Sequence, residues 1–355
     1  MNKYKVVVYA ICKNESAFVK RWVDSMSEAD QICVLDTGST DDTVALLEKA
    51  GVKVKQKRYE LFRFDKARND SLKEVDEDSD VCVCTDLDEV FSSGWRKEIE
   101  RLWKDKTEKL LYTYHWQVSE NNEPLVSFYG DKIHSRRSWK WKYPVHEVLT
   151  RTNVMPFSCK KSNIELIHLP DKQKSRTSYL PLLELCCKEY PNDNRSWHYL
   201  GREYAFYGSY EKAISCFNKY LDMPCAFNEE KSMTYRYMAE CYRNLSNSSE
   251  AEKCLIKAIS QTPSLREPYV DYATFLMDEK DFYGAIHFLN KALLIDTPSL
   301  AFAKENTCYS ALPYDLLSIC YYELKDVNNA HKCALKALSY GENERIRKNL
   351  EEYFS

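Results

Sequence analysis

A short apolar segment that runs directly into acidic residues constrains the fold of this chain most strongly. Val81-Cys82-Val83-Cys84 is followed at once by Thr85-Asp86-Leu87-Asp88-Glu89. An apolar run of this length is typical of a strand buried on both faces of a parallel sheet. Open α/β sheets bind ligands at the carboxyl ends of their strands, and carboxylate oxygens there suit Mg²⁺ or Mn²⁺. Asp86 and Asp88 are therefore candidate metal ligands, although a solvated turn would have the same composition.

The segments before this strand repeat the same arrangement. Residues 4–12 are apolar and rich in β-branched side chains, and residues 31–36 form a second expected strand. Ser39 and Asp42 have the spacing of a capping box, which predicts the start of a helix. Gly51 stands where a residue just past the end of that helix belongs. Alternating strands and helices over about 90 residues indicate a doubly wound α/β sheet.

Four motifs in this region carry a resemblance to a known family. They are Ile11-Cys12-Lys13-Asn14-Glu15, Val-Leu-Asp-Thr-Gly-Ser-Thr-Asp-Asp-Thr at residues 34–43, Phe64-Asp65-Lys66-Ala67-Arg68-Asn69, and Thr85-Asp86-Leu87-Asp88-Glu89. In this order they resemble the successive signatures of family 2 glycosyltransferases. The chain is most similar to the bacterial subgroup that joins such a domain to tetratricopeptide repeats and includes the S- and O-glycosyltransferases of bacteriocin peptides. The resemblance implies a GT-A fold with a Rossmann-like, mostly parallel sheet.

The same resemblance implies roles for individual residues. The positions that bind the nucleotide in the family correspond to Ile11, Asn14, Glu15, Asp36, Arg68 and Asn69. Asp86 would face the ribose or the metal, and Asp88 the metal. Because a diphosphate leaving group gains negative charge as the sugar bond breaks, a bound divalent cation would stabilise it. The expected ligands are therefore a nucleotide sugar, with UDP as the nucleotide, and Mn²⁺ or Mg²⁺.

A later segment supplies a candidate catalytic base. Trp139-Lys140-Trp141-Lys142-Tyr143-Pro144-Val145-His146-Glu147 resembles the family segment that ends in a His-Glu pair. Glu147 is a candidate general base for an acceptor hydroxyl or thiol. An ion pair of Glu147 with Lys140 or Lys142 is the alternative interpretation.

Two further side chains are candidates for the same site. His168 ends an apolar strand at residues 164–169 and is a candidate third metal ligand, or else a hydrogen-bonded core histidine. Arg137, in a His-Ser-Arg-Arg segment, is a candidate cation for the diphosphate, although a solvated basic turn would look the same.

The second half of the chain is predicted to be helical and repetitive. Ala213, Ala251, Ala285 and Ala330 occupy equivalent places in four units at intervals of about 34–45 residues, which is typical of a tetratricopeptide array. Pro224, Pro263 and Pro298 close the first three units, and an insertion is expected around residues 299–310. We therefore predict two domains, a GT-A domain over residues 1–172 and an all-α tetratricopeptide-repeat solenoid over residues 173–355.

Composition excludes several classes of protein. A net charge of −3 gives no sign of nucleic-acid binding. No apolar run approaches the ~18 residues of a membrane span, and the start does not resemble a signal peptide. Fourteen cysteines without such a signal indicate a reducing cytoplasm. The glycine-rich motifs of dinucleotide oxidoreductases and P-loop NTPases are missing from the sequence.

We therefore expect a cytoplasmic, bacterial, inverting glycosyltransferase whose peptide or protein acceptor is held partly by the repeats. A non-catalytic repeat scaffold with a degenerate sheet domain is the alternative, and a nucleotidyltransferase is a third class. Retention of Asp36, Asp86 and Asp88 argues against degeneration. The sugar, the acceptor and the base stay open. A homodimer also stays open, because repeat arrays mediate dimerisation as well as peptide binding.

Overall fold

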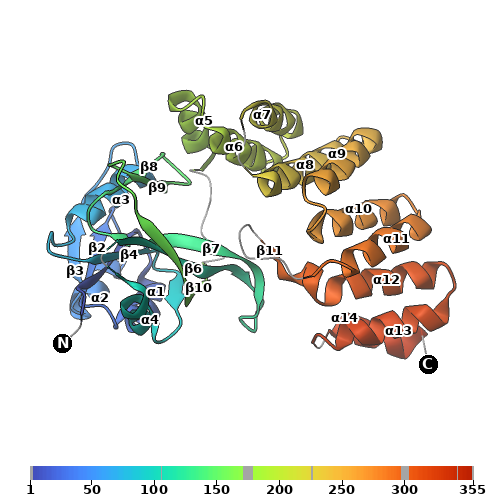
Figure 1. The fold of residues 1–355 in the computed structure, drawn as a ribbon, viewed down its shortest axis with the longest axis horizontal. Coiled ribbons are helices and arrows are strands. Elements are labelled where there is room, and N and C mark those ends of the chain that lie inside the picture. Colours follow the sequence, from blue (N-terminus) through green and yellow to red (C-terminus); the bar gives the residue numbers. More distant parts are fainter. Residues whose placement is uncertain are drawn as a thin grey trace. The chain divides into compact units, whose positions relative to one another are not determined.

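The chain divides into two compact units. The computed structural model describes residues 3–104, 106–170, 179–224, 227–296, 304–341 and 343–353. The units are Met1–Cys186 and Cys187–Ser355 (Figure 1). The predicted boundary between residues 172 and 173 lies outside the described residues and stays a prediction.

The first unit is built on a mostly parallel sheet, as predicted. The strand order is β3-β2-β1-β4-β7-β6-β10-β5. Strands β1, β2, β3 and β4 are mutually parallel, whereas β7 runs antiparallel to β4 and β6, and β5 runs antiparallel to β10. The strands are β1 (Val6–Cys12), β2 (Gln31–Asp36), β3 (Lys53–Gln56), β4 (Val81–Thr85), β5 (Glu89–Phe91), β6 (Thr107–Val118), β7 (Pro124–Ser135) and β10 (Ser158–His168). A separate antiparallel pair consists of β8 (Trp139–Lys142) and β9 (Val148–Arg151).

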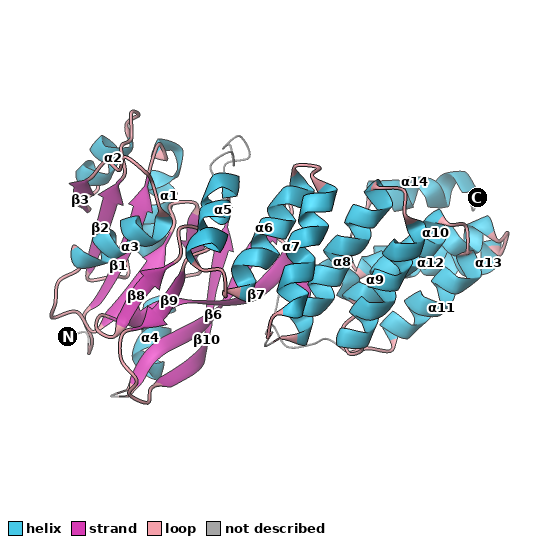
Figure 2. Ribbon diagram, turned by 90° about the horizontal axis from the view of Figure 1, so that it is seen from above, coloured by secondary structure: helices cyan, strands magenta, loops and turns pink. Residues whose placement is uncertain are grey.

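Both faces of this sheet are covered, which explains the unbroken apolar strands. All residues of β1 and β4 are buried. On one face, alternate residues of β1 pack with Trp22 of α1 (Ser16–Met26) and Ile99 of α4 (Trp95–Leu102). On the other face, the intervening residues pack with Leu72 of α3 (Phe64–Lys73) and with Trp139 and Trp141 of β8. The helices and the strand pair therefore cover the two faces of the sheet at β1 and β4 (Figure 2).

Helix α2 (Thr43–Lys49) shows one correct and one wrong prediction. It is followed by Gly51 with a φ of +80°, in the left-handed conformation expected after a helix. The capping box is wrong, because the Asp42 side chain makes no capping hydrogen bond and the Ser39 hydroxyl donates to Asp36 instead.

Helix hairpins form the second unit. Its helices, with α5 starting in the first unit, are α5 (Tyr179–Glu189), α6 (Asn194–Phe206), α7 (Tyr210–Asp222), α8 (Asn228–Asn244), α9 (Ser248–Gln261), α10 (Glu267–Asp278), α11 (Phe282–Leu293), α12 (Ala311–Glu323), α13 (Val327–Leu338) and α14 (Glu344–Tyr353). Two short elements, β11 (Lys304–Glu305) and the 3₁₀ helix η1 (Asn306–Tyr309), precede α12. The expected helical region is confirmed, with the two-residue strand β11 as an exception within its described part. The insertion expected at 299–310 lies partly outside the described residues, and Pro298 lies wholly outside them.

Small residues set the spacing of these hairpins. The four repeated alanines are fully buried near the starts of α7, α9, α11 and α13. Gly201 of α6 lies against Phe217 of α7, where an added Cβ would come within 2.6 Å of the ring. Helices α9, α11 and α13 also begin alike, because Asn247, Asp281 and Asp326 accept a hydrogen bond from the backbone N–H three residues on. The repeat in the sequence is thus a repeat of helix hairpins.

Candidate functional site

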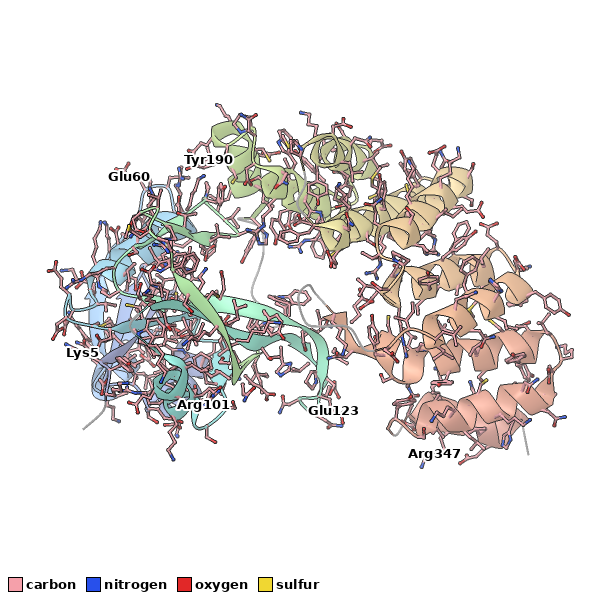
Figure 3. All side chains as sticks on the ribbon, in the orientation of Figure 1. Lys5, Glu60, Arg101, Glu123, Tyr190 and Arg347 are labelled. Carbon is pink, nitrogen blue, oxygen red and sulfur yellow. The ribbon has the colours of Figure 1, made fainter. Side chains whose placement is uncertain are left out.

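The predicted nucleotide-binding residues meet at the carboxyl ends of neighbouring strands. In Figure 3, Lys5 marks the amino end of β1, and Glu60 lies beyond the carboxyl end of β3. Cys12 pairs with Asp36, so that β1 and β2 end side by side. The loop after each strand therefore leaves the sheet at the same edge.

Asp36 organises the loop that follows β2. Its side chain is buried and accepts hydrogen bonds from the backbone N–H groups of Gly38 at 3.0 Å and Ser39 at 3.1 Å. Gly38 has a φ of +113°, which other residues rarely adopt. The carboxylate thus holds the loop in a tight turn against the end of the strand.

The loop after β1 is joined to the loop after β2. Asn14 has a φ of +54°, and its side-chain oxygen accepts a hydrogen bond from Thr40 N at 2.7 Å. The backbone N–H of Glu15 donates to Thr43 Oγ1 at 2.8 Å. Ile11 is buried in an apolar cluster with Leu35 and Ala67. The structure therefore brings Ile11, Asn14 and Glu15 to the same sheet edge as Asp36.

Arg68 lies at the centre of a buried ionic network. Its Nη2 is 2.8 Å from Asp86 Oδ1, and its Nε is 2.5 Å from Glu147 Oε1. The guanidinium also lies over the Trp141 ring, 5.3 Å from the centroid. Burial lowers the pKa of Arg68, but Asp86 and Glu147 outweigh burial and hold the pKa well above its ordinary value. The residue therefore carries a permanent positive charge between two carboxylates.

Lys132 and Glu89 belong to the same network and were missed by the sequence reasoning. Lys132 Nζ on β7 lies 3.4 Å from Asp86 Oδ2 and 3.6 Å from Glu89 Oε1. Glu89 is buried and accepts a hydrogen bond from the Asp86 backbone N–H at 2.9 Å. Glu89 stood in the acidic motif itself, whereas Lys132 is recognisable only once β7 is known to pair with β4.

This network fixes the charge of Asp86. Burial raises the pKa of the Asp86 carboxyl, but the positive charges of Arg68 and Lys132 outweigh burial and hold that pKa well below its usual range. Burial raises the pKa of Glu89, as do the charges of Asp86 and Asp88, against the opposing effect of Lys132. Asp86 is thus an ionised carboxylate engaged by two cations.

Asp88 forms a pair with His168. The distance from His168 Nε2 to Asp88 Oδ2 is 3.4 Å, and His168 Nδ1 lies 3.0 Å from the Trp116 carbonyl oxygen. Both side chains keep some exposure, 17% for Asp88 and 18% for His168. Strands β5 and β10 bring them together, because Glu89 pairs with His168. One carboxylate and one imidazole suit a divalent cation that takes its other ligands from a substrate.

The third expected metal ligand does not join this pair. Within the described ranges, no three His, Cys, Asp or Glu side chains gather closely enough to hold a metal ion. Asp86 is turned to Arg68 and Lys132, while Asp88 is turned to His168. On an extended segment residues two apart would point to the same side, but residues 86–88 form a turn after β4, which separates the two carboxylates.

Arg137 was predicted at this edge, and the prediction is wrong. Strand β7 runs antiparallel to β4, and Ser135 pairs with Val81, the first residue of β4. Arg137 therefore follows at the amino end of β4, whereas Asp86 follows its carboxyl end. Lys132, three residues before Ser135, is the β7 cation that reaches Asp86.

The Asn69 side chain is engaged in structural hydrogen bonds with β8. Its Nδ2 donates to the Trp141 carbonyl oxygen at 2.8 Å, and its Oδ1 accepts from the Trp141 backbone N–H at 2.9 Å. Helix α3 is thereby tied to β8, and the chain after β8 carries Glu147 back to Arg68. Glu147 thus has an ion-pair partner on α3 that the sequence interpretation, with Lys140 or Lys142, did not anticipate.

The helical unit contains a cavity of its own, with a volume of about 280 Å³. Arg236, Tyr237 and Glu240 of α8 and Asp271 of α10 line it. Arg236 Nε lies 2.5 Å from Asp271 Oδ2, and its Nη2 lies 2.8 Å from Glu305 Oε1. The cavity lining therefore combines charged side chains with an aromatic ring and apolar side chains such as Leu255.

Comparisons with known proteins agree with the first unit's architecture. Residues 7–153 match the family model described as Glycosyl transferase family 2. Uncharacterized glycosyltransferases of Rickettsia conorii and Rickettsia felis are 33% and 32% identical over 111 residues, which is 31% of this chain and 38% of each relative. The chain thus spans less than half the length of the curated relatives it matches.

Solved structures resemble about half of the chain. A crystal structure of MamA has a TM-score of 0.37 at 16% identity and covers 49% of this chain and 90% of its own. YrrB, described as a TPR protein with an unusual peptide-binding site, has a TM-score of 0.38 at 13% identity over 49% of this chain and 81% of its own. None of the helices in the described part of this chain is long and apolar enough to cross a bilayer.

Proposed function

We propose that this chain, whose residues 7–153 form a family 2 glycosyltransferase domain, transfers a sugar from a nucleotide-sugar donor to a peptide or protein acceptor. The reaction would invert the anomeric centre in one displacement. The observation that carries the proposal is the network in which Arg68 joins Asp86 and Glu147 at the carboxyl ends of the parallel strands. Open α/β sheets bind their ligands at this edge.

We place the nucleoside of the donor, with uridine as the expected base, beside the ends of β1 and β2. Ile11, Asn14, Glu15 and Asp36 surround this edge of the sheet. Asp36 holds the loop of residues 37–41 in shape through Gly38 and Ser39. A loop held in place before the donor arrives loses less conformational entropy on binding.

The diphosphate would lie near Asp88, His168 and Lys132. Asp88 and His168 would hold Mn²⁺ or Mg²⁺, which when bound would neutralise charge on the leaving diphosphate. Lys132 adds a positive charge at the same edge, and with Arg68 it keeps Asp86 ionised. In this arrangement Asp86 orients Lys132 and Arg68 and is not itself a metal ligand.

Glu147 remains the candidate base for the acceptor. Its side chain is 10% exposed, and Arg68 fixes Oε1 at 2.5 Å. The Arg68 contact holds the Glu147 side chain in one orientation, which a general base requires. The acceptor proton would pass to the Glu147 carboxylate as the acceptor attacks the sugar.

The helical unit is the proposed binding site for a peptide segment of the acceptor. The cavity around Arg236 and Tyr237 offers paired charges together with an aromatic surface. None of the thirteen cysteines in the described ranges is in a disulfide, which favours a reducing compartment such as a bacterial cytoplasm.

A donor screen tests the proposal. The full chain is incubated with a panel of nucleotide sugars and Mn²⁺, with and without a peptide library, and release of the nucleoside diphosphate is measured. We expect release with one class of UDP-sugar and about 10²–10³-fold slower release in Asp88→Asn. Asp24→Asn, on the exposed face of α1, is the matched control.

Calorimetry should show UDP binding that weakens in chelator. Binding of peptides without any nucleotide binding would instead support a repeat scaffold.

A further inference from the structure

In the described part of the chain, the loop between β9 and β10 exposes three apolar side chains. Val154 is 100% exposed, Met155 67% and Phe157 42%. Three such side chains within four residues are unusual on a protein surface, where single exposed apolar residues are the norm. This group, Val154, Met155 and Phe157, is called the apolar tip below.

The loop that carries the apolar tip is anchored at both ends. The backbone N–H of Thr152 donates to the Ser138 carbonyl at 2.8 Å, and Asn153 Nδ2 donates to Ser138 Oγ at 2.8 Å. At the other end, the backbone N–H of Ser158 donates to the Lys106 carbonyl at 2.9 Å. The Phe157 ring packs on Trp139 and lies under the Arg151 guanidinium, 4.4 Å away. The apolar tip is therefore carried by a loop whose two ends are fixed.

Positively charged side chains lie near the two ends of this loop. Residues 136–161 contain seven lysines and arginines and one acidic residue, in a chain whose net charge is −3; of the seven, Arg151 is paired with Glu108 of β6 at 3.1 Å. Arg137 is exposed next to Ser138, which binds the loop, and Lys106 is exposed beside Ser158. An apolar tip with lysines and arginines around it, which together form its basic surround, is suited to an anionic lipid surface. The headgroups there pair with the cations, and the apolar side chains enter the acyl boundary.

We propose that the apolar tip and its basic surround dock this chain peripherally on a membrane that contains anionic phospholipids. A nucleic acid would pair with the cations but would gain little from Val154 and Met155. The tip lies at the amino end of the strands, because Ser158 pairs with Thr107 at the start of β6. A membrane bound there would leave the opposite end of the strands, which carries Asp86 and Asp88, open to substrates. Membrane binding can therefore be tested independently of the proposed reaction.

Vesicle sedimentation with the full chain tests this proposal. The probes are vesicles of phosphatidylcholine alone and of phosphatidylcholine with phosphatidylglycerol. We expect binding to the anionic vesicles only, and its loss at high salt. Val154→Ser with Met155→Ser should weaken binding about tenfold or more, whereas Leu294→Ser with Val327→Ser, exposed apolar residues of the helical unit, should not.

Charge reversal provides the second arm. Each Lys or Arg near an anionic membrane strengthens binding about fivefold, so Lys106→Glu with Arg137→Glu should abolish sedimentation, and Lys291→Glu with Lys332→Glu should preserve it. All of these positions are exposed, so thermal unfolding should be unchanged in every variant. Absence of vesicle binding overturns the proposal. So does binding that needs the cations but not the tip, or a solution dimer that Val154→Ser with Met155→Ser dissociates while vesicles stay unbound.

Discussion

Arg68 Nε lies 2.5 Å from Glu147 Oε1, although 79 residues separate the two in the sequence. The same guanidinium reaches Asp86 through Nη2 at 2.8 Å. The buried Arg68 thus links Glu147, the proposed catalytic base, to Asp86, which lies where the donor is proposed to bind. Breaking this link should disturb both sides of the reaction, and the first two predictions follow from it.

Arg68→Lys should reduce kcat/KM for transfer about 10²-fold. Lysine keeps the charge, but its single ammonium cannot reproduce the planar donor geometry that engages two carboxylates at once. Steady-state kinetics with the preferred donor measure the change, and circular dichroism checks the fold. Arg63→Lys, on a buried arginine paired with Asp65 just before the same helix, is the control. Activity of Arg68→Lys within about threefold of the parent would remove Arg68 from the mechanism.

Glu147→Gln should abolish transfer to a hydroxyl acceptor and preserve UDP binding. Glutamine can still accept a hydrogen bond from Arg68, but it cannot take the proton from the acceptor. A cysteine acceptor should suffer less, because a thiol with a pKa near 8.5 ionises partly unaided. Paired assays on serine- and cysteine-containing peptides measure the difference. Glu165→Gln, on an exposed β10 side chain, is the control. Unchanged transfer to serine would place the base elsewhere, with His146 as the next candidate.

Lowering the pH should destabilise the first unit through His134. The buried ring lies 2.7 Å from the Tyr9 hydroxyl, and burial lowers the pKa of His134 from 6.5 to about 4. Below about pH 6.5 the unfolded chain binds a proton that the folded chain does not yet bind. The free energy of unfolding should therefore fall by about 3 kcal/mol as the pH drops from about 6.5 to about 4.

Urea unfolding at a series of pH values, followed by a probe of the first unit, measures this slope. His134→Gln should be less stable at neutral pH and should have a flatter profile in that window. His198, which is buried in the second unit with a pKa lowered to about 3, is present in both proteins and cancels in the comparison. Parallel profiles for the parent and the variant would mean that other groups set the acid sensitivity.

Truncation should separate donor chemistry from acceptor binding, provided that α5 is kept. The Tyr179 ring lies 5.9 Å from the Phe64 ring and 6.0 Å from the His146 ring, measured between centroids. A chain ending after residue 190 should therefore hydrolyse donor and bind UDP, but transfer to a peptide should fall sharply. A chain ending at the predicted boundary, after residue 172, lacks Tyr179 and should unfold more easily. Undiminished peptide transfer by the longer truncation would show that the helical unit does not hold the acceptor.

Local chemistry was enough to predict much of this protein. The fully apolar strands, the acidic residues at their ends and the spaced alanines indicated a mostly parallel sheet followed by helical hairpins, because burial on both faces and close helix packing restrict residue choice directly. Asp36 and Asp88 were recognised as carboxylates at strand ends for the same reason. These signals depend only on neighbours along the chain.

Only the tertiary structure decided which charges meet. Strand register places Lys132 beside Asp86 and sends Arg137 to the far end of β4, and an antiparallel register depends on how distant segments pair. The Asn69 contacts with Trp141 bring Glu147 to Arg68, a relationship that no local spacing encodes. Side-chain direction likewise separated Asp86 from Asp88. The sequence alone determined the elements and the strand ends; the pairing of distant elements determined the ionic network, because electrostatic partners depend on a few ångströms of three-dimensional distance.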